Sequence, residues 1–113
     1  MQALIHRIKS ILFFSLLIAT KLQAQETGNI KGKIVEQITE QPIAGATVTL
    51  KERQVTVVTD SSGMYVFSNV SAGSYSIIIS YIWFREKMLD EVTVLRAKTY
   101  YLKTELLENN EGA

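Results

Sequence analysis

The sequence predicts an all-β protein, a β-sandwich of seven antiparallel strands preceded by a signal-peptide helix. Apolar and polar side chains alternate from residue 28 onward, turn-forming residues recur at short intervals, and no segment carries an amphipathic helical stripe. Many short strands with regular turns and no helices are typical of a sandwich. The expected strands are 29–36, 46–51, 55–60, 64–69, 74–82, 86–95 and 99–107.

The alternation is clearest in two segments. In ATVTLK (46–51), the alanine, valine and leucine point to one face, and the threonines and lysine point to the other. In SYSIIISYI (74–82), Tyr75, Ile77, Ile79 and Tyr81 share a face. Period-two alternation indicates strands with one wet face, as in antiparallel sheets.

The N-terminus has the organisation of a secretory signal peptide. A basic start with Arg7 and Lys9 is followed by the apolar run ILFFSLLIA, and the segment ends on the small residue Ala24. Lys21 interrupts the apolar run well before the roughly 20 residues that a spanning helix needs. We therefore expect export, with an uncleaved anchor or an interfacial helix as the alternative.

The sequence thus predicts a signal peptide over 1–24, one domain over 25–108 and a loose tail over 109–113. Cleavage removes three of the twelve Lys and Arg residues, none of the eleven Asp and Glu residues and the one histidine, which leaves a net charge of −2. This charge does not favour nucleic acid. The chain has no cysteine, so the fold must rely on its apolar core, and the commonest zinc ligands and the thiol nucleophile are absent. We expect no cofactor and no metal.

The stretch TDSSGMYVF (59–67) reads as a hairpin turn that leads into a core strand. Asp60 at the first turn position can accept a hydrogen bond from the backbone two residues on, and Gly63 tolerates the positive φ that closes the turn. The alternative is a calcium loop, which requires several spaced carboxylates. Only one carboxylate is present, so the turn is favoured.

The ordered series of turn and strand residues resembles the carboxypeptidase regulatory-like domain. The resemblance implies a transthyretin-like seven-stranded sandwich, similar in architecture to immunoglobulin domains, and covers nearly all of the chain after residue 24. In this pattern Tyr65 and Phe67 face the core, and Gly45, Gly63 and Gly73 provide turn conformations. The residues that carry it are Gly28-x-Ile30-x-Gly32-x-Ile34, Pro42-Ile43-x-Gly45-Ala46-x-Val48-x-Leu50, Thr59-Asp60-x-x-Gly63-x-Tyr65-x-Phe67, Val70-x-x-Gly73-x-Tyr75 and Ser80-Tyr81.

The resemblance implies a scaffold and supplies no catalytic residue. Domains of this family are found at the N-terminus of TonB-dependent outer-membrane receptors of the SusC type, directly after a signal peptide. No plug or barrel follows here, so we expect either a stand-alone relative or the opening of a receptor. Either way, the resemblance implies the periplasm or the outer membrane, with membrane association only through a partner.

One departure from the family pattern lies after Ser80-Tyr81, where a glycine and an aromatic residue are usual. This chain instead has Ile82, Trp83, Phe84 and Arg85. Neighbouring strand residues face opposite ways, so at least one ring lies near the surface. The favoured interpretation is that Trp83 or Phe84 caps the end of the sandwich, and the alternative is that Trp83, Phe84 and Arg85 are a possible interaction surface.

Three functions follow. The favoured one is a non-catalytic interaction module of the cell envelope, with an envelope protein or a receptor plug and barrel as partner. The alternative is a small carbohydrate-binding domain that uses Trp83, Phe84, Tyr100 and Tyr101. An enzyme is disfavoured, because the available carboxylates fit turns and a solvated face better than a tuned acid–base pair. These carboxylates are Asp60, Glu86, Asp90 and Glu91.

Overall fold

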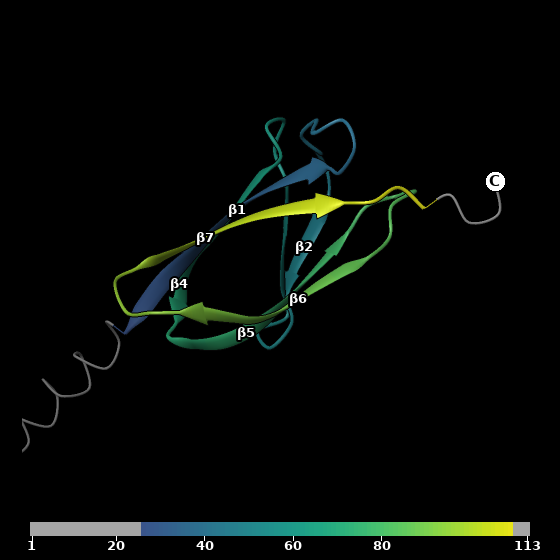
Figure 1. Cartoon of the computed structure of the whole chain (residues 1–113). Helices are drawn as coiled ribbons and strands as arrows, with labels where there is room; N and C mark the ends of the chain where they lie inside the picture. Colours follow the sequence, from purple (N-terminus) through teal and green to yellow (C-terminus); the bar gives the residue numbers. More distant parts are fainter. Residues whose placement is uncertain (1–25, 110–113) are drawn as a thin grey trace, which may run out of the picture.

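The computed structural model describes residues 26–109 as two packed β-sheets (Figure 1). One sheet has three strands in the order β4-β1-β7, and the other has four in the order β3-β2-β5-β6. The predicted signal peptide and residues 110–113 lie outside the described part. Residues 26–109 contain no helix that could span a membrane. The strands are β1 (Thr27–Glu36), β2 (Thr47–Leu50), β3 (Val55–Val58), β4 (Met64–Ser71), β5 (Gly73–Ser80), β6 (Lys87–Val94) and β7 (Thr99–Leu106).

The predicted seven-stranded sandwich is confirmed, with one difference in strand direction. Four of the five strand pairings are antiparallel, but β1 and β7 run parallel over 29–36 and 99–106. A tight hairpin makes its two strands antiparallel neighbours, whereas β7 follows β6, which lies in the other sheet. The connection after β6 bonds instead to the start of β1, where the Ala97 amide donates to the Thr27 carbonyl at 2.8 Å. The expectation of a fully antiparallel sandwich was therefore wrong for this pair.

The core consists of the alternate side chains that face the space between the sheets. On β5, Tyr75, Ile77 and Ile79 are buried, and Tyr81 beyond the strand is half-buried, as the alternation predicted. β1 contributes Ile30 and Ile34 from the opposite sheet. Each fully buried aliphatic side chain of this size contributes about 1.5–3 kcal/mol of transfer free energy. The sandwich is thus held by side chains from strands far apart in the sequence.

Tyr65 on β4 lies across β1 where that strand has no side chain. A Cβ atom at Gly32 would overlap the Tyr65 ring, so a glycine is required there. The Tyr65 ring also packs edge-to-face on Phe67, with centroids 5.9 Å apart. Its hydroxyl is buried without a hydrogen-bond partner, and burial raises the pKa of Tyr65 to about 12. The hydroxyl group is therefore a liability inside an otherwise apolar packing unit.

Thr59, at the end of β3, joins this strand to the loop before β2. Its buried hydroxyl donates to the Ile43 carbonyl at 2.7 Å and accepts from the Ala46 amide at 2.9 Å. The Thr59 backbone makes two further bonds, to the Gly45 amide and the Ala46 carbonyl. One threonine thus satisfies four polar groups of a loop that closes one end of the core.

Replacing Thr59 by valine tests this clamp. The valine keeps the shape but leaves the Ile43 carbonyl and the Ala46 amide unpaired, so we expect a loss of about 3 kcal/mol in unfolding free energy. Urea denaturation followed by circular dichroism measures it. Thr59→Ser, which keeps the hydroxyl, should lose much less, and equal losses for the two variants would contradict the role of the hydroxyl.

Tyr65→Phe tests the buried phenol. The folded state keeps this group neutral, so its pKa of about 12 exceeds the ordinary value of 10.0. The phenol therefore loses its proton more readily in the unfolded chain than in the folded protein. This difference does not affect the unfolding free energy below pH 10, and it lowers the unfolding free energy as the pH rises from 10 toward 12. We expect Tyr65→Phe to be at least as stable as the wild type at pH 8 and to show a smaller fall in urea midpoint between pH 8 and pH 11. An identical fall in both proteins would show that other groups control alkaline unfolding.

Candidate interaction surface

The turn between β5 and β6 presents Ile82, Trp83, Phe84 and Arg85 at one end of the sandwich. The Phe84 amide donates to the Tyr81 carbonyl at 3.1 Å, which closes a four-residue turn. We call residues 81–85 the end turn.

Backbone hydrogen bonds hold the end turn against the segment that follows β7. The Arg85 amide donates to the Leu107 carbonyl at 3.0 Å, and the Asn109 amide donates to the Trp83 carbonyl at 2.7 Å. Phe84 and Glu108 form an isolated antiparallel bridge between these bonds. The turn is therefore anchored on both sides of Phe84, including by Asn109, the first residue of the predicted tail.

Trp83 has an unfavourable backbone conformation and an exposed side chain. Its φ is +70°, in the left-handed region, and it is the only aromatic residue among 26–109 with such an angle. The third position of a turn with positive φ normally carries glycine or asparagine. A bulky residue there costs roughly 1–2 kcal/mol. Trp83 is 74% exposed, so packing within the domain does little to offset this cost.

Phe84 has the opposite environment. Its ring is half-buried, packs against the core and lies 5.6 Å from the Tyr81 ring, centroid to centroid. The two neighbouring aromatic residues thus divide the two roles that the sequence left open. Phe84 covers the end of the core, and Trp83 points into solvent beside the exposed residues Ile82 and Arg85.

The four aromatic residues considered for a sugar platform do not come together. Tyr100 and Tyr101 lie at the start of β7, opposite Ile30 and Lys31 of β1. The end turn contacts residues 107–109, beyond the other end of β7. At about 3.3 Å per strand residue, the two aromatic groups are roughly 20 Å apart. The four rings therefore do not form one platform.

The turn residues singled out in the sequence lie at three separate connections. Asp60 Oδ1 accepts from the Ser62 amide at 2.9 Å and the Met64 amide at 3.0 Å, so backbone donors occupy the one carboxylate of this loop. Gly63 and Gly45 have φ of +74° and +80°, and Gly73 opens β5 with φ +157°. This geometry is that of a hairpin turn at TDSSG.

The remaining acidic residues are exposed. Asp90 on β6 accepts from the Ser76 hydroxyl at 3.0 Å, Glu91 occupies a β-bulge with φ +57°, and Glu86 precedes β6. The nearby Glu52 carboxylate accepts from the Ser76 amide at 2.8 Å, and this bond lowers the pKa of Glu52. Within the described range, no group of three or more His, Cys, Asp or Glu side chains is placed to hold a metal ion.

Fold and side-chain placement together define a small β-sandwich domain whose distinctive surface feature is an exposed aromatic turn. The chain belongs to the carboxypeptidase regulatory-like domain family, whose model matches residues 29–107. No curated protein matches the chain in sequence.

Solved structures share the fold. A chain of the type II Cohesin-X-Dockerin complex from Acetivibrio cellulolyticus is 27% identical over 66% of this chain and 52% of that one, with a TM-score of 0.57. A candidate carbohydrate-binding protein from Bacteroides uniformis is 15% identical over 73% and 42% of the two chains, with a TM-score of 0.56. The major pilin subunit of Bacillus cereus is 20% identical over 71% and 30%, with a TM-score of 0.55. This chain spans about half or less of the length of each.

Trp83→Gly tests the strain at the end turn. Because glycine adopts positive φ freely and Trp83 is largely exposed, we expect the variant to be more stable by up to about 1 kcal/mol. Trp83 is the only tryptophan, so the variant has no tryptophan fluorescence. The urea transition is therefore followed by circular dichroism. Ile82→Gly is the matched control, because Ile82 is equally part of the turn but lacks positive φ. We expect this control to lose stability, and a similar loss for Trp83→Gly would contradict the assignment of strain.

Proposed function

We propose that the chain is a non-catalytic interaction module, exported to the cell envelope, that binds a partner protein through the end turn. The observation that carries the proposal is Trp83, an exposed aromatic residue at a position with positive φ, which glycine adopts more readily. Backbone strain that local packing does not offset is typical of functional sites. Tryptophan and arginine are also the residue types most enriched among binding hot spots, and Arg85 lies two positions away.

A protein partner is favoured over a glycan by the distribution of the aromatic residues. Sugar-binding platforms need rings that line one surface, and Tyr100 and Tyr101 lie far from Trp83. The end turn instead combines two exposed apolar side chains, Ile82 and Trp83, with the exposed Arg85. An apolar anchor with a neighbouring cation fits a protein surface that offers a small hydrophobic pocket rimmed by acidic groups.

Export is supported by residues 1–24, with their basic start, short apolar run and terminal small residue. The family's occurrence at the N-terminus of TonB-dependent receptors makes such a receptor, or its plug and barrel, the favoured partner. We therefore propose the periplasm or the outer membrane as its location, whether the module is a separate protein or the opening of a receptor.

A pull-down from separated envelope and cytosolic fractions tests the proposal. We expect the wild-type protein to capture a partner from the envelope fraction, and Trp83→Gly to lose at least about tenfold of that capture while remaining folded. Tyr101→Ala is the matched control, because Tyr101 is as exposed as Trp83 but lies on the start of β7. Equal capture by wild type and Trp83→Gly would overturn the role of the end turn. Capture only from cytosol would overturn the assignment to the envelope.

The same material tests the glycan alternative. Trp83 fluorescence that changes on addition of an envelope glycan, together with unchanged protein capture by Trp83→Gly, would favour a carbohydrate ligand.

A further inference from the structure

The four sheet edges of the sandwich differ in how they are protected. The edges are β4 and β7 in one sheet and β3 and β6 in the other. β6 carries three charged residues and a bulge, and β7 carries Lys103 and Glu105. The Lys87 ammonium also reaches from β6 to the Glu105 carbonyl of β7, at 3.3 Å. Charges and bulges of this kind prevent an edge from pairing with another strand.

The opposite side of the sandwich lacks this charge protection. β3 (VTVV) and β4 (MYVFSNVS) contain no charged residue, and they are the edge strands that face each other there. Val55, Val58 and Val66 are exposed on these edges. Although Asn69 lies in a bulge near the end of β4, β3 has a regular register with β2 along its whole length.

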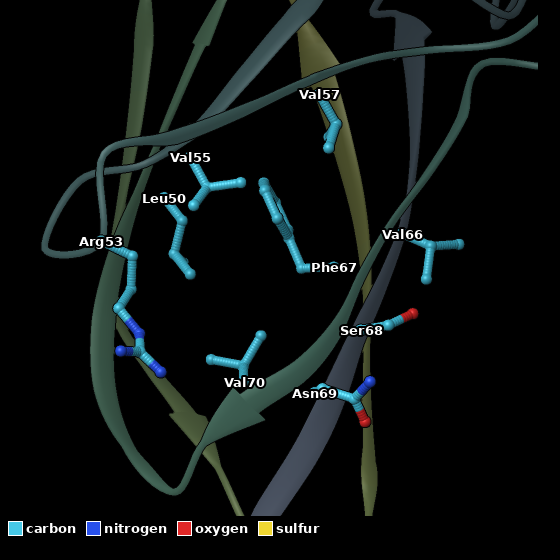
Figure 2. Close-up of a pocket in the computed structure, with 9 residues that line it drawn as sticks. All are labelled: Leu50, Arg53, Val55, Val57, Val66, Phe67, Ser68, Asn69 and Val70. Atoms are coloured by element: carbon cyan, nitrogen blue, oxygen red, sulfur yellow. The ribbon is translucent and has the colours of Figure 1, made fainter.

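A cleft of about 310 Å³ lies between the two edges (Figure 2). Leu50, Phe67 and Val70, which belong to the core, line it together with Val55 and Val57 of β3. Figure 2 shows these apolar side chains around the open space. An apolar side chain that enters the cleft would therefore contact side chains that belong to the core.

The free edge of β3 has backbone groups available for pairing. The Thr59 amide donates to the Ala46 carbonyl, toward β2. Backbone direction alternates along a strand, so Val55 and Val57 also bond toward β2, whereas the N–H and C=O groups of Thr56 and Val58 point outward. This edge has the geometry that strand addition requires.

Arg53 supplies a charge at one end of the cleft. It lies in the turn between β2 and β3, and its Nη2 donates to the Ser71 hydroxyl at 2.7 Å. No carboxylate of residues 26–109 is paired with it, and a guanidinium has five donors in a fork that matches a carboxylate. Arg53 is thus a cation with unused donors beside Val55, where β3 begins.

We propose that the cleft accepts an extended segment of a partner protein, which adds to β3 as an antiparallel strand. Alternate apolar side chains of the segment enter the cleft and contact Phe67 and Val70. A carboxylate at the C-terminal end of the segment binds Arg53, because a strand antiparallel to β3 ends beside Val55. This surface is separate from the end turn and does not depend on the role proposed for Trp83.

The test uses a capped peptide of about seven residues in which threonine and valine alternate and the last residue is glutamate. We expect binding to slow hydrogen exchange at the Thr56 and Val58 amides of isotope-labelled protein by about tenfold or more, with little change at Val55 and Val57. A matched peptide that ends in glutamine should bind about tenfold more weakly. The variant Arg53→Gln should bind both peptides equally.

Two edge variants and one control complete the experiment. Thr56→Pro removes an outward N–H that β2 does not use, and Val55→Lys places a charge on the edge; each should abolish peptide binding. Trp83→Gly should bind the peptide like the wild type, so a failure here is distinguishable from a failure at the end turn.

Three results would overturn the proposal. One is the absence of any change at Thr56 and Val58 up to about 1 mM peptide. Another is binding that Arg53→Gln and both edge variants leave intact. The third is protection of the same amides that rises with protein concentration without peptide, which would identify a second copy of the chain as the occupant.

Discussion

The packing of two sheets through the alternate side chains of their inner faces is the constraint on which the rest of the structure depends. The chain has no cysteine, so no disulfide supports the sandwich. Ile30 and Ile34 from one sheet, and Ile77 and Ile79 from the other, have no exposed surface. Shifting any of these strands by one residue would turn its apolar side chains outward, so this burial fixes the register of each strand.

The core also explains why strain is tolerated at the end turn. Phe84 packs on Tyr81 and the core, and backbone bonds on both sides of it hold the turn against residues 107–109. These contacts over-determine the path of the chain, so Trp83 keeps a left-handed conformation that it would not adopt alone. The half-buried Phe84 thus positions the turn, and the exposed Trp83 is accessible from solvent. The cleft between β3 and β4 is a second accessible surface, on the side of the sandwich where the edge strands carry no charged residue.

Local patterns predicted most of the fold. Alternation gave the seven strands to within about two residues, because a strand with one buried face must alternate. The turn at Asp60 and Gly63 could be predicted because both residues act within four positions along the chain. The parallel pairing of β1 and β7 could not, because it depends on where the chain crosses between sheets. The role of Thr59 was missed for a similar reason: its partners, Ile43 and Ala46, are 16 and 13 positions away.

The candidate surfaces were less predictable than the fold. Sequence indicated that one of two aromatic neighbours would be exposed, but only the backbone angle shows that Trp83 occupies a position suited to glycine. The aromatic residues Tyr100 and Tyr101 looked like partners of Trp83 in composition, although the length of β7 separates them. No pattern in the sequence indicated the cleft beside Arg53, because the cleft forms where two edge strands of different sheets face each other.

The most direct measurement is site-specific photo-crosslinking in intact cells, with benzoylphenylalanine in place of Trp83. The substitute is also a bulky aromatic residue, so it keeps the character of the exposed side chain. The same substitute in place of the equally exposed Tyr101 serves as the reference. We expect a discrete cross-linked envelope protein from position 83 and none from position 101. No product from position 83, or the same products from both positions, would contradict the end turn as the recognition surface.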